Sequence, residues 1–303
     1  PYAFCSNFYC TLNARELVSL IRSIRFGRGR GIPELCAIAD QLADQLAELF
    51  PALRPELAAP TEETPLPEEP APLFQDAPVW VPASEAGAVE LLAAPVDPGK
   101  LLERARRAAD PRSDARLSLA ELTASPRPRE LEQLSYTFAI SDLSLAGLTH
   151  LVRHRMQSVI VPPLQGVDHS RFILPDAVSA NPAALAVYQS ALSEARGTAQ
   201  ALCENPALRP YSYYFAVAGN LLDVMTTLNA RELMLIVRLR TCTRAQWEIR
   251  HVAMGLLRLL REHYPDLFGR FGPSCYLTGV CPEGRMSCGR QAEMKELFGG
   301  TLL

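Results

Sequence analysis

The sequence lacks several features that would assign it to a broad class at once. No apolar run approaches the roughly 20 residues that a membrane-spanning helix requires. The 30 basic and 33 acidic residues nearly cancel, so no overall positive field favours nucleic acid or an acidic membrane surface. Eight cysteines among 303 residues are too few for a disulfide-dense secreted scaffold. We therefore expect a cytoplasmic protein with neither a membrane nor a nucleic acid as its partner.

A phosphate-binding glycine loop is also missing. The sequence FGRGRG at 26–31 lacks the G-x-G-x-x-G spacing, and no strand is expected before it. With 48% hydrophobic and 21% charged residues, the chain can bury a core as one large or two smaller domains.

The most informative feature is a repeat of the heptapeptide TLNAREL at 11–17 and 227–233. The second copy continues as MLIVRLRTCTRAQWEIR, rich in polar side chains at regular intervals. The first has lost most of them: Ile24 stands at the position of Arg240, and Arg30 at that of Gln246. We therefore expect function in the second copy.

The repeat and the composition predict four segments. Residues 1–58 are expected to form the C-terminal part of a degenerate first repeat, and 59–73 a Pro/Glu-rich extended linker, which includes PTEETPLPEEPAP. Residues 74–268 are expected to form a complete domain, and 269–303 a cysteine-containing tail.

Apolar spacing predicts helices and strands that are segregated along the chain, which favours an α+β domain over a wound βαβ repeat. Expected helices are 34–49, 101–109, 117–122, 142–155, 182–203, a helix that begins at Asn229, and 245–263. Expected strands are 79–81, 88–93, 134–140 and 211–217.

Two groups of side chains are candidates for binding. Arg153, His154 and Arg155 are expected to end a helix, where they either complement the helix dipole or clamp a phosphate. Asn229 and Arg240 share a helix face by their spacing, as do Gln246 and Arg250 on the next helix. These groups either converge on a planar heterocycle, or Asn229 only caps its helix and Arg240 is exposed to solvent.

Three thiols in the tail raise the question of a metal. Cys275, Cys281 and Cys288 would need a fourth ligand such as Cys242 or His263. Their spacings of five and six intervening residues differ from the two to four of zinc knuckles, so reduced structural thiols are the favoured interpretation.

Three stretches together resemble the flavin-dependent thymidylate synthases: LEQLSYTFAI, LAGLTHLVRHRMQS and TLNARELMLIVRLRTCTRAQWEIRHVA. The resemblance covers residues 72–264. It implies an α+β fold with a central, mostly antiparallel sheet flanked by helices. It also implies a tetrameric enzyme with FAD between subunits, here a homo-oligomer or a tandem-repeat pseudo-oligomer. Such an enzyme methylates dUMP to dTMP with methylenetetrahydrofolate and NADPH, and reduced flavin instead of a cysteine nucleophile carries the hydride.

The resemblance also implies roles for individual residues. Arg240 would lie against the uracil and favour its ionised form. The flavin would contact Arg153, His154, Arg155, Asn229, Arg231 and Arg244. The nucleotide would contact Arg153, Ser158, Arg240 and Gln246.

Departures from the family pattern leave two alternatives open. Ser158 is present, but Val161, Pro163 and Gln165 stand where polar or charged nucleotide ligands are expected. His150, Gln133, Tyr213 and Leu235 also replace expected residues. The chain is then either a synthase with a variant nucleotide pocket, or a divergent paralogue that binds flavin or nucleotide in a regulatory or structural role.

Overall fold

The computed structural model describes residues 9–61, 71–111 and 119–300. The chain divides into two compact units. The first contains Pro1–Asp76, Pro163–Ser170 and Val187–Val217, and the second contains Ala77–Pro162, Arg171–Ala186 and Ala218–Leu303. The expected boundaries at 58, 73 and 268 remain predictions, and most of the expected linker, 62–70, lies outside the described residues.

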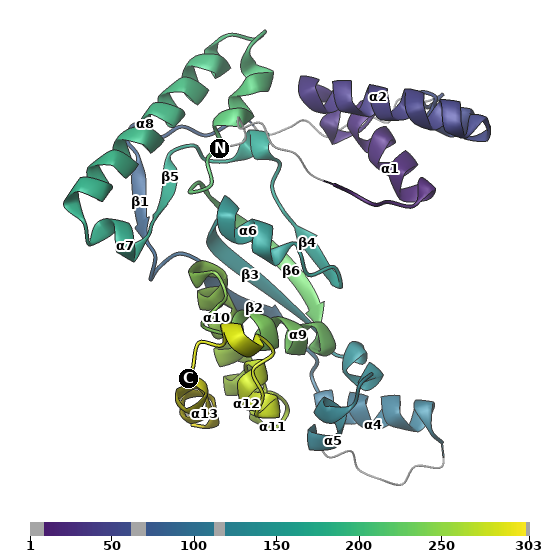
Figure 1. The fold of residues 1–303 in the computed structure, drawn as a ribbon, viewed down its shortest axis with the longest axis vertical. Coiled ribbons are helices and arrows are strands. Elements are labelled where there is room, and N and C mark those ends of the chain that lie inside the picture. Colours follow the sequence, from purple (N-terminus) through teal and green to yellow (C-terminus); the bar gives the residue numbers. More distant parts are fainter. Residues whose placement is uncertain (1–8, 62–70, 112–118, 301–303) are drawn as a thin grey trace. The chain divides into compact units, whose positions relative to one another are not determined.

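The second unit is built on a four-stranded antiparallel sheet (Figure 1). Its order is β2 (Ala88–Ala93), β3 (Ser135–Ser144), β6 (Leu221–Asn229) and β4 (Gln157–Ile160). Strand β3 forms because Tyr136, Phe138 and Ile140 alternate with more polar residues, and all three are fully buried. A separate parallel pair joins β1 (Val79–Pro82) to β5 (Arg171–Leu174).

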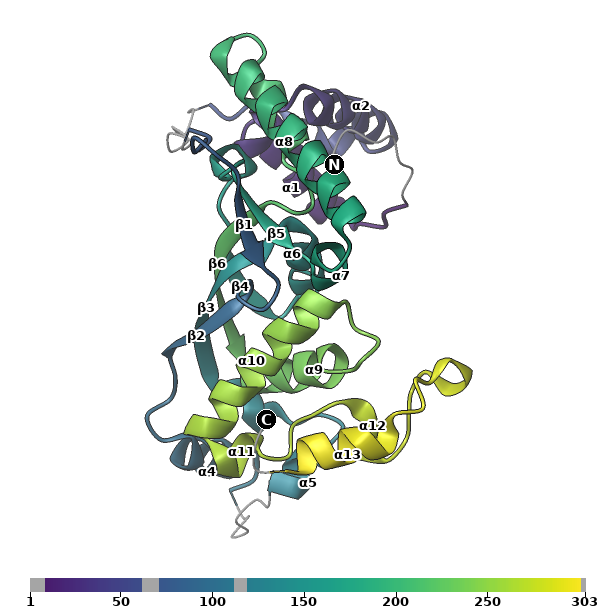
Figure 2. The same ribbon diagram turned by 90° about the vertical axis from the view of Figure 1, so that its left-hand side faces the viewer.

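Three helices of this unit pack beside the sheet. They are α6 (Leu145–Leu151), α9 (Ala230–Arg240) and α10 (Trp247–His263). Helix α10 contacts β2, α6 and α9, and Figure 2 shows the three helices on one side of the strands. Its buried stripe of Ile249, Val252, Leu256 and Leu260 explains that contact. The expected α+β class, with helices flanking an antiparallel sheet, is confirmed.

The first unit contains a helical hairpin made by the first heptapeptide copy. Helix α1 (Ala14–Arg25) packs on α2 (Pro33–Leu49), and α3 (Arg54–Leu57) closes a small core of Ile21, Ala43, Leu46 and Leu57. Helices α2 and α10 both have 17 residues. The first helices, α1 and α9, have 12 and 11 residues, and the tandem repeat remains a prediction.

The remaining helices are shorter or peripheral. They are α4 (Pro98–Ala109), α5 (Leu119–Ala124), α7 (Asp176–Ser179), α8 (Pro182–Glu204), α11 (Pro265–Phe268), α12 (Ser274–Thr278) and α13 (Gln291–Gly299). Six 3₁₀ turns, η1 to η6, also occur among the described residues. Within the described ranges, none of the helices combines the length and the apolarity needed to cross a membrane.

Two expected elements were wrong. The segment 211–217 is not a strand but largely the 3₁₀ helix η5 (Arg209–Phe215), where Tyr213 and Tyr214 stack and the Tyr214 hydroxyl donates to Glu34. The helix expected at 142–155 is only α6, because Ser144 still pairs with β6 and then caps the helix by accepting from the Gly147 N–H.

Candidate active site

The site is built where β6 passes into α9. Asn229 is the last residue of β6 and also the N-cap of α9, and its Oδ1 accepts a hydrogen bond of 2.9 Å from the Glu232 N–H. This cap begins α9 at the end of β6, an inner strand of the sheet, and Glu232 in the first turn of α9 contacts His154 in the segment after α6. The same cap occurs between Asn13 and Glu16 in the first hairpin, also at 2.9 Å.

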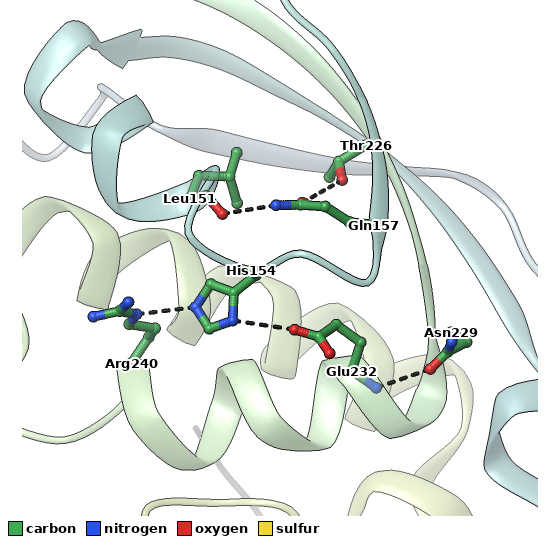
Figure 3. Close-up of polar contacts among 7 residues, drawn as sticks. All are labelled: Leu151, His154, Gln157, Thr226, Asn229, Glu232 and Arg240. Carbon is green, nitrogen blue, oxygen red and sulfur yellow. Dashed lines mark hydrogen bonds and ion pairs between the residues drawn. The ribbon is translucent and has the colours of Figure 1, made fainter. Parts of the chain in front are cut away.

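His154 lies between an acid and a base of α9, as Figure 3 shows. Arg240 Nε donates to His154 Nε2 at 3.1 Å, and His154 Nδ1 lies 3.2 Å from Glu232 Oε1. An arginine N–H only donates, so Nε2 must be the acceptor and Nδ1 carries the proton toward Glu232. The result is a Glu–His–Arg chain in which Glu232 and His154 are buried, Arg240 is partly buried, and each partner orients the next.

Burial is the main cause of the pKa shifts of Glu232, His154 and Arg240. His154 is 5% exposed, and burial followed by the charge of Arg240 lowers its pKa to about 4. Burial also raises the pKa of Glu232, against the opposing effect of Arg231. Arg240 has a lowered pKa, first from burial and then from Arg153, but a guanidinium stays charged at neutral pH. Neutral His154 therefore orients Arg240 without adding a charge of its own.

The Arg-His-Arg step does not end a helix, since α6 stops at Leu151. Arg153 and Arg155 are exposed, whereas both ring nitrogens of His154 are occupied by Glu232 and Arg240. The structure thus gives His154 a positioning role. The expected flavin contacts of Arg153, His154 and Arg155 remain predictions. Because both ring nitrogens of His154 already have partners, His154 is not expected to form a hydrogen bond to the flavin.

His150 adds a polar group to the same neighbourhood. Its Nδ1 is buried with no hydrogen-bond partner among the described residues. Its pKa is lowered by burial first, then by Arg240 and Arg153. These two arginines thus act on one small region, which concentrates positive potential suitable for an anionic ligand.

The loop after His154 is fastened to the sheet. Gln157 Nε2 donates to the Leu151 carbonyl at 2.7 Å, and its Oε1 accepts from Thr226 Oγ1 at 2.9 Å (Figure 3). Ser158 is exposed and pairs with Thr227 in the ladder of β4 and β6. The expected contact of Ser158 with a nucleotide remains a prediction.

A cavity of about 1060 Å³ opens beside the first turn of α9. Its polar lining includes Asn229, Arg231, Glu232, Arg238, Arg270 and Tyr276. Arg231 also forms an ion pair with Glu132. Ligand pockets usually span about 300–1000 Å³, so this volume and its three arginines suit a large anionic ligand such as a flavin dinucleotide. The cavity includes the expected flavin residues Asn229 and Arg231, whereas Arg153 and Arg240 do not line it.

Two expected site residues are engaged in structural contacts on the turn after α9. Arg244 Nε and Nη2 donate to the Met286 carbonyl at 3.2 and 2.9 Å. Gln246 does not share a helix face with Arg250, because it precedes α10 and caps it through a 2.8 Å hydrogen bond from the Ile249 N–H. Arg250 instead donates to the Thr241 carbonyl.

The sequence did not point to two buried acids. Spacing indicates Glu232 only as the partner of the Asn229 cap, whereas in the structure it also contacts His154. Glu248 is 1% exposed, and it accepts from the Ser144 N–H at 2.7 Å and from Ser144 Oγ at 2.5 Å. The available signal was helical spacing: Glu248 stands one and two turns before the buried Val252 and Leu256, on the apolar face of α10.

An antiparallel α+β core with a Glu–His–Arg chain and a large cavity lined by three arginines and two glutamates defines the class of protein. Residues 90–266 match the Thy1 family, described as thymidylate synthase complementing protein. This match covers more than half of the chain, and the chain belongs to that family.

Individual relatives agree. The flavin-dependent thymidylate synthase of Geobacter sulfurreducens is 36% identical over 191 residues, which cover 61% of this chain and 82% of the relative. That of Clostridium tetani is 36% identical over 188 residues, covering 55% and 74%. A solved UMP/dUMP methylase, PolB from Streptomyces cacaoi bound with 5-Br UMP, has the same fold, with a TM-score of 0.53 and 21% identity. That comparison covers 60% of this chain and 92% of PolB.

Proposed function

We propose that this chain is a flavin-dependent thymidylate synthase that methylates a uridine nucleotide, and that dUMP is the favoured substrate. Methylenetetrahydrofolate would be the carbon donor and NADPH the reductant. The observation that carries the proposal is the placement of Arg240. Its Nε is fixed by neutral His154, and its two terminal amino groups have no hydrogen-bond partner in the described part of the chain.

A fixed guanidinium with free donors suits one step in particular. Positioned against a uracil ring, Arg240 would stabilise the negative charge that the ring develops when it is activated for attack on a one-carbon unit. His154 and Glu232 hold that cation in place, so little reorganisation is needed when the charge develops. The Glu–His–Arg chain is therefore a means of orienting Arg240.

The same residues fit a flavin. When bound, a reduced flavin supplies the hydride that converts the transferred carbon to a methyl group. Asn229 and Arg231 would hold it from the cavity wall, and Arg153 and Arg155 would meet its phosphates. Arg244 would join that set only after releasing the Met286 carbonyl.

The variant nucleotide pocket favours a second candidate, a paralogue with another anionic substrate. Val161 and Pro163 offer no side-chain donor where the family pattern expects polar ligands. Each missing charge-assisted contact would cost about 1.5–3 kcal/mol. Two of them would weaken nucleotide binding by roughly 10²–10⁴-fold, unless His150 or other groups replace them.

A visible absorbance titration tests the proposal. The purified chain is mixed with FAD, and the flavin spectrum is followed while dUMP or UMP is added. We expect a bound-flavin spectrum that one of these nucleotides perturbs saturably, followed by methyl transfer in a turnover assay. In Arg240→Ala the flavin should remain bound, whereas the nucleotide response and turnover should be lost.

Arg258→Ala is the matched control, since Arg258 is an exposed arginine on α10. It should behave as the unsubstituted chain. Bound flavin that ignores both nucleotides would favour the paralogue, and an absence of flavin binding would refute the enzyme.

A further inference from the structure

The C-terminal segment, residues 269–300, supplies one wall of the large cavity. This segment follows the range 90–266 that matches the family, and it includes α12 and α13. Its residues Arg270 and Tyr276 line the cavity together with Arg238 of α9. Figures 1 and 2 show α12 close to α9. The family match therefore leaves this part of the site without an assigned role.

Hydrogen bonds and packing fasten this wall to the helices of the second unit. Arg238 Nε donates to Ser274 Oγ at 3.0 Å, which joins α9 to the start of α12. Arg261 of α10 donates from Nη2 to the carbonyls of Phe271 and Phe298, both at 2.9 Å. Phe271 and Phe298 are each 1% exposed. The wall is therefore part of the packed core, as in ligand pockets that are formed before the ligand binds.

The cysteines of the segment lie at a different place. Cys275, Cys281 and Cys288 line a separate small cavity with Cys242, and all four are free thiols. His263, the other fourth ligand considered from the sequence, does not line that cavity. In the described part of the chain, no three His, Cys, Asp or Glu side chains are placed to hold one metal ion. The free hydrogen-bond donors of the segment lie instead at the large cavity.

The two acids that line the large cavity are engaged with other partners. Glu132 forms an ion pair with Arg231, and Glu232 Oε1 lies 3.2 Å from His154 Nδ1. Within the described ranges, neither carboxylate forms an ion pair with the other two arginines of the lining. Those two positive charges are therefore not neutralised by the cavity itself.

Arg238 and Arg270 are the two arginines with free donors. Arg238 uses Nε for Ser274, and its terminal amino groups have no hydrogen-bond partner among the described residues. The guanidinium of Arg270 likewise has no partner there, and both side chains are exposed. Two guanidinium groups that face one cavity repel each other, and an anion between them removes that repulsion. The fork of an arginine matches the oxygens of a phosphate group in particular.

The rest of the cavity indicates what carries the anion. Its volume of about 1060 Å³ is far larger than a phosphate group, so the anion should be one part of a large ligand. Met234, Leu235 and Phe271 give the lining an apolar surface beside the arginines. Asn229 and Arg231, the residues proposed to hold the flavin, line the same cavity. A flavin dinucleotide combines an apolar ring system with a diphosphate and suits this lining.

We propose that Arg238 and Arg270 bind the diphosphate of FAD and make the site select FAD over a flavin without phosphate. The inference rests on the proposed function, because it takes the flavin to occupy this cavity. Arg153 and Arg155 do not line the cavity. They and the two cavity arginines can share the diphosphate, since it offers several non-bridging oxygens as acceptors.

Calorimetric titration of the full chain with FAD and with riboflavin tests this assignment. Riboflavin has the same ring system as FAD but no phosphate. In Arg270→Ala and in Arg238→Gln we expect the Kd of FAD to rise by about tenfold or more, because each variant loses a charge-assisted contact. The Kd of riboflavin should change by less than about twofold, since the ring does not contact these arginines. Arg270→Lys should recover part of the FAD affinity, because the positive charge is kept.

Arg285→Ala is the matched control, because Arg285 is an exposed arginine of the same segment and does not line the cavity. It should bind both flavins as the unsubstituted chain does.

Three outcomes would overturn the inference while the proposed function stands. Equal weakening of FAD and riboflavin would show that the two arginines only support the cavity wall. Unchanged FAD binding in both variants would place the diphosphate elsewhere. A raised KM for NADPH or methylenetetrahydrofolate, with FAD binding intact, would assign the arginines to a co-substrate. A chain that binds neither FAD nor riboflavin would refute the proposed function and this inference together.

Discussion

At the residue scale, the main finding is a buried histidine that stays neutral between opposite charges. His154 accepts from Arg240 and donates to Glu232, so both nitrogens are satisfied only in one neutral tautomer. Protonation of Nε2 would place a second positive charge against Arg240. The arrangement of Glu232, His154 and Arg240 therefore depends on pH through the protonation of His154.

We expect the native state to lose stability on the acid side of neutrality. The pKa of His154 is about 4 in the folded chain and about 6.5 when unfolded, so between these values the unfolded state binds the extra proton. The contribution of neutral His154 to the free energy of unfolding is therefore fully present above pH 6.5. It falls by about 3 kcal/mol as the pH drops to 4.

Urea unfolding of the unsubstituted chain and of His154→Gln between pH 4 and 8 measures this effect. Glu232 changes the free energy of unfolding in the opposite direction. Its pKa is raised in the folded state, so above pH 4.5 the folded state binds the extra proton, and the stability falls as the pH rises. Because His154 Nδ1 contacts Glu232, the difference between the two curves reports the titration of the His154–Glu232 pair. Curves that run parallel across this range would show that His154 is not buried in its neutral form.

At the element scale, one acid joins a strand, a short helix and a long helix. Glu248 of α10 accepts from the backbone and hydroxyl of Ser144, which ends β3 and caps α6. Burial raises the pKa of Glu248, while the bonds from Ser144 act in the opposite direction. Gly147 allows this approach, because a Cβ there would lie 2.8 Å from the Glu248 carboxyl group.

We expect Ser144→Ala to destabilise the second unit by about 2–3 kcal/mol. The substitution leaves a buried carboxyl oxygen without its hydroxyl donor and removes the cap of α6. Chemical denaturation with a probe of tertiary structure measures the loss. Ser190→Ala on α8 is the control, since its hydroxyl contacts Glu194 only on the surface and should change stability by less than about 0.5 kcal/mol. Equal effects of the two substitutions would contradict the role of Glu248.

At the scale of the whole molecule, two hairpins share a cap but not a set of functional side chains. Asn13 and Asn229 accept from Glu16 and Glu232 at the same distance. The second hairpin carries Arg240 and faces the large cavity, whereas the first has Ile24 at that position. The cap therefore maintains the local fold in both copies, and the difference in chemistry comes from the residues that follow.

This contrast gives a matched pair of substitutions. Asn13→Ala and Asn229→Ala should each lower stability by about 1 kcal/mol, because each removes one helix cap. We expect only Asn229→Ala to lower the occupancy of FAD, measured by absorbance after desalting, since only Asn229 lines the cavity. Loss of flavin in Asn13→Ala alone would place the flavin site in the first hairpin.

The sequence by itself determined the class of fold and most helices, and it directed the search for a site to the second heptapeptide copy. Alternation in β3 and helical spacing in α2 and α10 are local patterns, and burial followed them. It failed at 142–155 and 211–217, where pairing with β6 and tyrosine stacking outweighed local preference.

Only the tertiary structure decided how the site residues are paired. His154 and Arg240 are 86 residues apart, and Ser144 and Glu248 are separated by 104. Cys242 likewise joins the tail thiols only in space. Spacing along a helix identifies residues that share a face, but the partner across a packed interface is fixed by how strands and helices pack. The chemistry of this protein depends on those long-range pairs.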